Sequence, residues 1–144
     1  MLSSYGQSSY HIILVPKYRR RAFAREDIAR CLRMLIKCIA RKEGLRVHAL
    51  EVMPDNAHLF LEIPPSKSMA QVIHLLKGKT AYHLFRVFPE LRAMFKRGHL
   101  WSRGKFFRSV GSVTDEVIEH YISDSQERGG GPGRRLRGRL LVSH

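Results

Sequence analysis

The feature that most constrains the fold is a pair of strand-like segments joined by a two-residue turn near the middle of the chain. Residues 45–53 and 56–63 have the length and apolar content of strands, and the Pro-Asp pair at 54–55 is typical of a tight turn. The pattern predicts an antiparallel hairpin, in which Glu51 pairs with His58. The chain therefore contains an antiparallel sheet whose register decides which side chains share a face.

The segments around this hairpin alternate between strand and helix patterns. A capping box at Ser68 and Gln71 starts one helix, and Gly44 stands where a C-cap glycine ends another. The expected elements are a strand at 9–15, helices at 26–43, 68–88 and 89–95, a last strand at 100–110 and a helix at 115–126. This order predicts an α+β fold of the ferredoxin-like split βαβ type, with a four- to five-stranded antiparallel sheet and an added C-terminal helix.

Composition divides the chain into one domain, residues 1–126, and a Gly/Arg-rich tail, residues 127–144. The net charge of +14 favours a polyanionic partner, nucleic acid first and an anionic membrane surface second. No apolar run reaches the roughly 20 residues of a membrane span, and the polar N-terminus has no signal-peptide pattern. We therefore expect a cytoplasmic protein without membrane association.

The second hairpin strand presents a polar set on one face. Alternate side chains of a strand share a face, so Asn56, His58 and Glu62 point the same way. Donors at positions i and i+2 can reach one ion, which makes this strand a candidate half-site for a metal. A lone strand histidine is more often a hydrogen-bonded structural residue, and Glu51 opposite His58 could orient the imidazole or act as a ligand itself.

Tyr121 lies on the apolar stripe of the helix expected at 115–126. From spacing alone, the favoured interpretation is an ordinary core tyrosine. A tyrosine becomes an effective nucleophile only where a metal or cation stabilises the charge that develops on its target.

Taken together, residues 9–126 resemble the single-tyrosine HUH transposases (TnpA type, IS200-like) of small bacterial and archaeal insertion sequences. Four segments in the same order carry this resemblance, and they read SYHIILVPKYRRRAF, GLRVHALEVMPDNAHLFLEIPP, LLKGKTAYHLFRVFPEL and LWSRGKFFRSVGSVTDEVIEHYISDSQ. The resemblance implies the fold given above and a homodimer. It also implies that the tyrosine helix of one subunit can serve the metal site of the other.

The resemblance further implies a chemistry for the site. Mg²⁺ or Mn²⁺ would be held by Asn56, His58 and Gln126, and Tyr121 would attack a phosphate of single-stranded DNA. The products would be a 5′-phosphotyrosine and a free 3′-hydroxyl, which allows strands to be rejoined. The DNA partner would carry hairpins at the ends of the element.

Two positions depart from the family pattern, and both concern the metal. Asn56 stands where the family has the first histidine of its His-hydrophobe-His motif. Ser125 stands where the family has glutamine, and Gln126 is one residue further, about 140° around the helix from Tyr121 after five residues. These departures leave an alternative, a descendant that binds hairpin or single-stranded DNA but cleaves it poorly.

Basic residues recur at positions that suit a DNA-binding surface. Charge runs are usually solvated faces, but here aromatic residues such as Tyr18 and Phe106 are interleaved with them. A third interpretation, an RNA-binding ferredoxin-like domain, rests on a faint RNA-recognition motif at 103–107 and lacks a second aromatic strand. The candidate nucleic-acid-binding residues are Lys17, Arg19, Arg20, Lys77, Lys79, Arg103 and Lys105.

Overall fold

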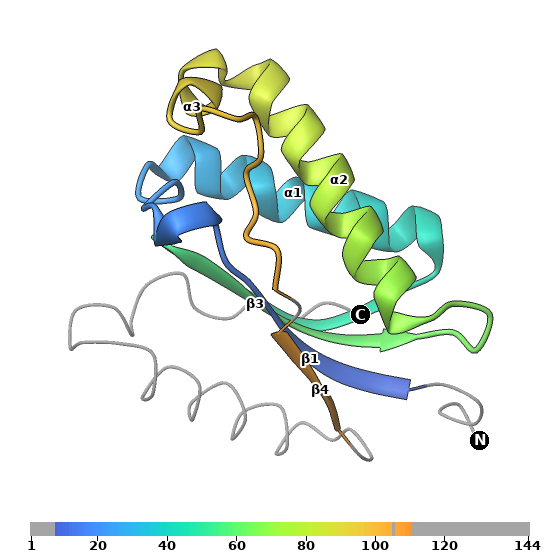
Figure 1. Cartoon of the computed structure of the whole chain (residues 1–144). Coiled ribbons are helices and arrows are strands. Elements are labelled where there is room, and N and C mark those ends of the chain that lie inside the picture. The colour runs from blue at the N-terminus through green and yellow to red at the C-terminus, as the bar shows by residue number, and fades with distance from the viewer. Residues whose placement is uncertain (1–7, 105, 111–144) are drawn as a thin grey trace.

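The computed structural model describes residues 8–104 and 106–110, which form a sheet covered on one face by helices (Figure 1). The four antiparallel strands are ordered β2-β3-β1-β4. Their bounds are β1 Ser8–Leu14, β2 Arg46–Met53, β3 Asn56–Ile63 and β4 Phe106–Val110. This order confirms the α+β, ferredoxin-like prediction. The helix predicted at 115–126 and the tail at 127–144 lie outside the described residues.

Two long helices begin and end where the local sequence predicts. Helix α1, Glu26–Glu43, is ended by Gly44 in the left-handed conformation with φ 75°. Helix α2, Met69–Val87, begins with the reciprocal capping box of Ser68 and Gln71. The short helix α3, Pro89–Ala93, follows with proline at its first turn, and a 3₁₀ turn, η1, spans Lys17–Arg19.

The hydrophobic core lies between the sheet and the pair α1 and α2, which cover the same face (Figure 1). Strand positions one residue apart point to opposite faces, so every second residue of β1 and β3 enters this core. The most buried of them are Ile12, Ala57, Leu59 and Leu61. The alternate residues of the same strands face away from the helices, and those positions carry the candidate site.

The last predicted strand is shorter than expected. Trp101 makes only an isolated bridge with Pro16, and the regular strand β4 starts at Phe106 instead of residue 100. The bridge itself is hydrogen-bonded to the continuation of β1, since Lys17 N donates to the Leu100 carbonyl and Ser102 N donates to the Val15 carbonyl, both at 2.8 Å. The ammonium of Lys77 donates to the carbonyl oxygens of Ser102 at 2.9 Å and Gly104 at 2.8 Å. A Cβ at Gly104 would stand 2.5 Å from the Cζ atom of Phe106, so a larger residue there would require this half-exposed ring to move.

Across the described ranges, helices are too short or too polar to cross a membrane.

Candidate functional site

The site is built by the register of three neighbouring strands. In the hairpin, Glu51 pairs with His58, as the sequence predicts, and Met53 pairs with Asn56. The first strand then lies beside β3, with Ile13 opposite His58 and His11 opposite Phe60. Opposed residues share a face, so this register puts His11 and His58 together on the face turned away from α1 and α2.

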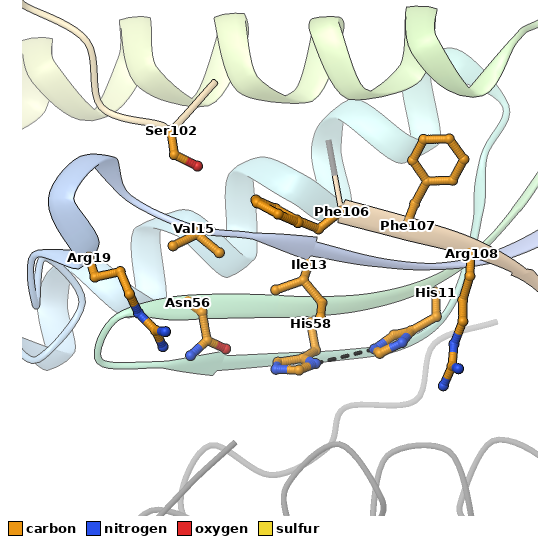
Figure 2. Close-up of a pocket in the computed structure, with 10 residues that line it drawn as sticks. All are labelled: His11, Ile13, Val15, Arg19, Asn56, His58, Ser102, Phe106, Phe107 and Arg108. Carbon is orange, nitrogen blue, oxygen red and sulfur yellow. Dashed lines mark hydrogen bonds between the residues drawn. The ribbon is translucent and has the colours of Figure 1, made fainter. Parts of the chain in front are cut away.

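A pocket of about 650 Å³ opens at this place, near the hairpin turn (Figure 2). Strand β4 forms one side of it, because Phe106 is opposite Ile13 and Arg108 is opposite His11. The pocket combines imidazole, amide, guanidinium and aromatic groups in one hollow. Its lining residues are His11, Ile13, Val15, Arg19, Asn56, His58, Ser102, Phe106, Phe107 and Arg108.

The two histidines are in direct contact. His11 Nε2 and His58 Nδ1 are 3.2 Å apart, within hydrogen-bonding distance (Figure 2). Their rings are stacked at 24° with centroids 5.3 Å apart, and both residues are buried. Sequence reasoning found His58 and missed His11. The available signal was a histidine inside the apolar run 9–15, but only the pairing of β1 with β3 brings it to the site.

The amide of Asn56 is held with its oxygen available to the pocket. Its Nδ2 donates to Asp55 Oδ1 at 2.7 Å, and Asp55 Oδ2 lies 3.4 Å from the guanidinium of Arg19. Asn56 is 5% exposed, and its Oδ1 accepts no hydrogen bond from the part of the chain that is described. A buried carbonyl oxygen without a donor is a suitable ligand for a hard divalent cation.

The donor set of this pocket therefore fits a divalent ion in composition. Within residues 8–104 and 106–110, no group of three or more His, Cys, Asp or Glu side chains could hold a metal. The pocket instead offers two imidazoles and one amide oxygen, from His11, His58 and Asn56. The other candidates, the predicted ligand Gln126 and the predicted nucleophile Tyr121, lie outside the described residues.

The basic residues after β1 are divided between two sides of a strained turn. Tyr18 and Arg19 have φ of 62° and 53°, a conformation uncommon for residues with a side chain. This turn directs Arg19 into the site pocket, while Lys17 and Arg20 line a second hollow of about 240 Å³. The Tyr18 ring is 71% exposed, with the Arg20 guanidinium 5.6 Å and the Lys17 ammonium 5.8 Å from its centroid. The second hollow also contains Lys96 and Arg97, which the sequence did not single out.

The remaining basic candidates lie along α2 and the segment after it. Lys77 and Arg103 line a third hollow of about 360 Å³, together with Gly78. The ammonium of Lys77 is engaged by the two backbone carbonyls described above, so this residue holds the chain segment in place. Lys79 is half-buried on the same helix, and Lys105 lies outside the described residues.

Comparison with known proteins identifies the family. Residues 4–125 match the family described as "Transposase IS200 like". The chain belongs to this family. This IS200-like transposase is 33% identical over 120 residues to the transposase for insertion sequence element IS200 of Salmonella typhimurium, covering 81% of this chain and 78% of that protein. It is 32% identical over 122 residues to the ISDra2 transposase TnpA of Deinococcus radiodurans, covering 85% of this chain and 86% of that protein.

Solved structures agree with this assignment. A crystal structure of a Deinococcus radiodurans protein described as a transposase superposes with TM-score 0.67 at 33% identity, covering 82% of this transposase and 90% of that chain. A REP-associated tyrosine transposase bound to a REP hairpin superposes with TM-score 0.59, covering 85% and 68% of the two chains. At 12% identity the second likeness concerns the fold alone.

Proposed function

We propose that this IS200-like transposase cleaves and rejoins single-stranded DNA at the ends of an insertion sequence through a phosphotyrosine at Tyr121. Family membership supports the reaction class. The observation that carries the site assignment is the buried Oδ1 of Asn56, which has no hydrogen-bond partner among residues 8–104 and 106–110 and lies in the same pocket as His58. Such an arrangement costs stability in an ordinary protein interior and is expected where a ligand completes the site.

The chemical step requires a nucleophile and a leaving group on one phosphorus. The phenolic oxygen of Tyr121 attacks the phosphorus and loses its proton, while the bond from phosphorus to the 3′-oxygen breaks. The 3′-oxygen leaves and becomes a hydroxyl, and the 5′-phosphate stays bound to the tyrosine. Rejoining is the reverse attack by a 3′-hydroxyl, so the phosphodiester energy is conserved in the protein–DNA bond.

Asn56, His58 and Gln126 are the proposed ligands of the Mg²⁺ or Mn²⁺ ion. A divalent ion bound there would polarise the scissile phosphate and stabilise its developing negative charge. Arg19 lines the same pocket and can pair with a phosphate oxygen, although its ion pair with Asp55 must then be shared. Asp55 keeps the Asn56 amide turned so that nitrogen faces the turn and oxygen faces the pocket.

The exposed side of the η1 turn is the proposed binding surface for unpaired bases and their phosphates. An exposed tyrosine with cations beside it suits base stacking, which contributes about 1–3 kcal/mol per base. Lys17, Arg20, Lys96 and Arg97 can neutralise phosphates around the Tyr18 ring. Lys79, Arg103 and Lys105 extend the proposed surface along the chain. That a solved neighbour of the same fold is bound to a REP hairpin supports hairpin DNA as the ligand.

The deciding test is a covalent adduct assay. Labelled single-stranded hairpin oligonucleotides from the flanks of the gene are incubated with the protein and Mg²⁺ or Mn²⁺, then separated under denaturing conditions. Wild type should give a metal-dependent adduct that Tyr121→Phe lacks while still binding DNA. Tyr82→Phe is the matched control, since Tyr82 is 57% exposed on α2 and away from the site pocket. Adduct formation by Tyr121→Phe would refute Tyr121 as the nucleophile.

The proposed homodimer is tested with two inactive variants. If the tyrosine helix serves the partner's site, mixing Tyr121→Phe with His58→Ala creates one intact site per mixed dimer and restores adducts. If the tyrosine and the metal site belong to the same subunit, every active site in the mixture keeps one defect, and no adduct forms. A monomer by sedimentation would overturn the dimer itself.

The alternative function is hairpin binding with poor cleavage, and the substitution of histidine by Asn56 favours it. Asn56→His should then raise both metal affinity and adduct yield. Tight hairpin binding with no adduct in either protein would make the alternative the better description. Unchanged metal affinity in the variant would argue that Asn56 does not weaken the site.

DNA binding should also depend steeply on salt. Each neutralised phosphate contributes about −0.7 to the slope of log affinity against log salt for single strands. Replacing Lys17 or Arg20 by methionine removes one phosphate contact, so each variant should show a slope that is less steep by about 0.7. A flat response in wild type would contradict electrostatic DNA binding.

A further inference from the structure

We propose that His11 is a metal ligand, so that the neighbouring strand β1 supplies the imidazole that position 56 lacks. Among the described residues, the ligands would be Nε2 of His11, Nδ1 of His58 and Oδ1 of Asn56. This inference rests on the proposed metal use and adds a ligand that the hairpin motif does not contain.

The spacing of the two nitrogens carries the argument. Two nitrogens bound to one ion at about 2.0–2.2 Å, with an angle of about 90–110° between them, stand about 3–3.5 Å apart. His11 Nε2 and His58 Nδ1 are 3.2 Å apart. The pair therefore has the separation of two ligands of a single ion without movement of either strand.

The same separation suits a hydrogen bond in the metal-free protein. One imidazole then donates its N–H to the other. On metal binding that hydrogen must leave the facing nitrogen, because both nitrogens need a free lone pair to bind the ion. Each neutral ring can carry its proton on the nitrogen that faces away from the ion.

The sheet fixes these two side chains in place. β1 and β3 are the two central strands in the order β2-β3-β1-β4, and each is hydrogen-bonded on both sides. Since Ile13 is opposite His58, His11 is the diagonal neighbour of His58, a relation that long side chains can bridge. Both rings are nearly parallel and buried, with exposed fractions of 4% and 6%. A pair held this rigidly loses little conformational entropy when it binds an ion.

The proposed set changes the metal that the site prefers. Mg²⁺ favours oxygen ligands, while imidazole suits later divalent metals. Two imidazoles and one amide oxygen should therefore favour Co²⁺ or Zn²⁺ over Mg²⁺, and should bind Mn²⁺ through nitrogen as well as oxygen. A site made of Asn56 and His58 without His11 would prefer Co²⁺ or Zn²⁺ over Mg²⁺ less strongly.

The experiment counts coordinated imidazoles in the full chain. Mn²⁺ or Cu²⁺ is added alone, its affinity is measured by calorimetry, and pulsed electron paramagnetic resonance counts the histidine nitrogens on the ion. Wild type should show two imidazoles on the ion. His11→Gln and His58→Gln should each show one, and each should bind the metal at least about tenfold more weakly than wild type. His83→Gln, on the exposed surface of α2, should keep two.

The outcomes separate this inference from the proposed function. One imidazole in wild type overturns His11 as a ligand and makes it a positioning residue for His58, while the proposed reaction stands. If His11→Gln does not fold, the count in wild type and in His58→Gln still decides. Two imidazoles in wild type without any DNA adduct would support the ligand set and refute the cleavage reaction. No bound metal would overturn both.

Discussion

The two hydrogen bonds of Lys77 allow a quantitative prediction about how the segment before β4 is held. Lys77→Met keeps the length of the side chain and removes the ammonium that binds the carbonyls of Ser102 and Gly104 at 2.9 and 2.8 Å. A hydrogen bond to a charged group contributes about 1.5–3 kcal/mol. Two independent bonds of this kind would contribute about 3–6 kcal/mol together. Because one half-buried ammonium serves both carbonyls and water can replace it in part, we expect a total loss below that sum, about 2–3 kcal/mol.

The measurement is urea unfolding of wild type and variant at neutral pH, with the midpoint shift converted through a common slope. Lys79→Met is the matched control, two residues away on the same helix. It should change stability by less than about 0.5 kcal/mol while weakening DNA binding. If Lys77→Met is as stable as the control, the contact does not hold the segment, and the reasoning fails.

Three further perturbations follow from the same structure. Thr80→Val should cost about 1–3 kcal/mol in thermal or urea unfolding, because the buried Oγ1 accepts the indole N–H of Trp101 at 2.9 Å and the variant leaves that donor unpaired. Gly78→Ala should stabilise α2 by about 1 kcal/mol, since a Cβ there meets no atom within 4 Å; a simultaneous loss of DNA affinity would indicate close approach of the ligand to this glycine. Hydrogen bonding to Arg25 lowers the pKa of Glu90, so this ion pair stabilises the fold above the ordinary carboxyl pKa of about 4.3 and is lost as pH falls through the lowered value. Unfolding curves of wild type and Arg25→Gln should therefore converge in acid, and a constant difference down to pH 2 would contradict the assignment.

Local signals in the sequence were sufficient for the helices and the hairpin. The capping box at Ser68 and the glycine at position 44 act within one helical turn, so neighbouring residues alone decide them. The hairpin register, with Glu51 opposite His58, follows from the short turn and from the side-chain period of two. These interactions are nearly independent of the remaining fold.

The last strand was predicted less well, because contacts distant in sequence decide it. Residues 100–110 have the composition of one strand, yet only Phe106–Val110 is regular. At the interruption the ammonium of Lys77, 25 residues away in sequence, donates to the carbonyl of Ser102, while Ser102 N still donates to the Val15 carbonyl. No local pattern reveals that a helix side chain will bind this backbone oxygen.

The sequence by itself determined the two long helices, the hairpin, the polar face of the second hairpin strand and the resemblance that leads to the transposase family. Only the tertiary structure brought His11 to His58, set Asn56 against Asp55 and Arg19, and separated Arg19 from Lys17 and Arg20. The physical reason is the range of the interactions. Caps, turns and periodicity act within a few residues, whereas the pairing of β1 with β3 joins positions 47 residues apart, and its register alone decides which donors meet.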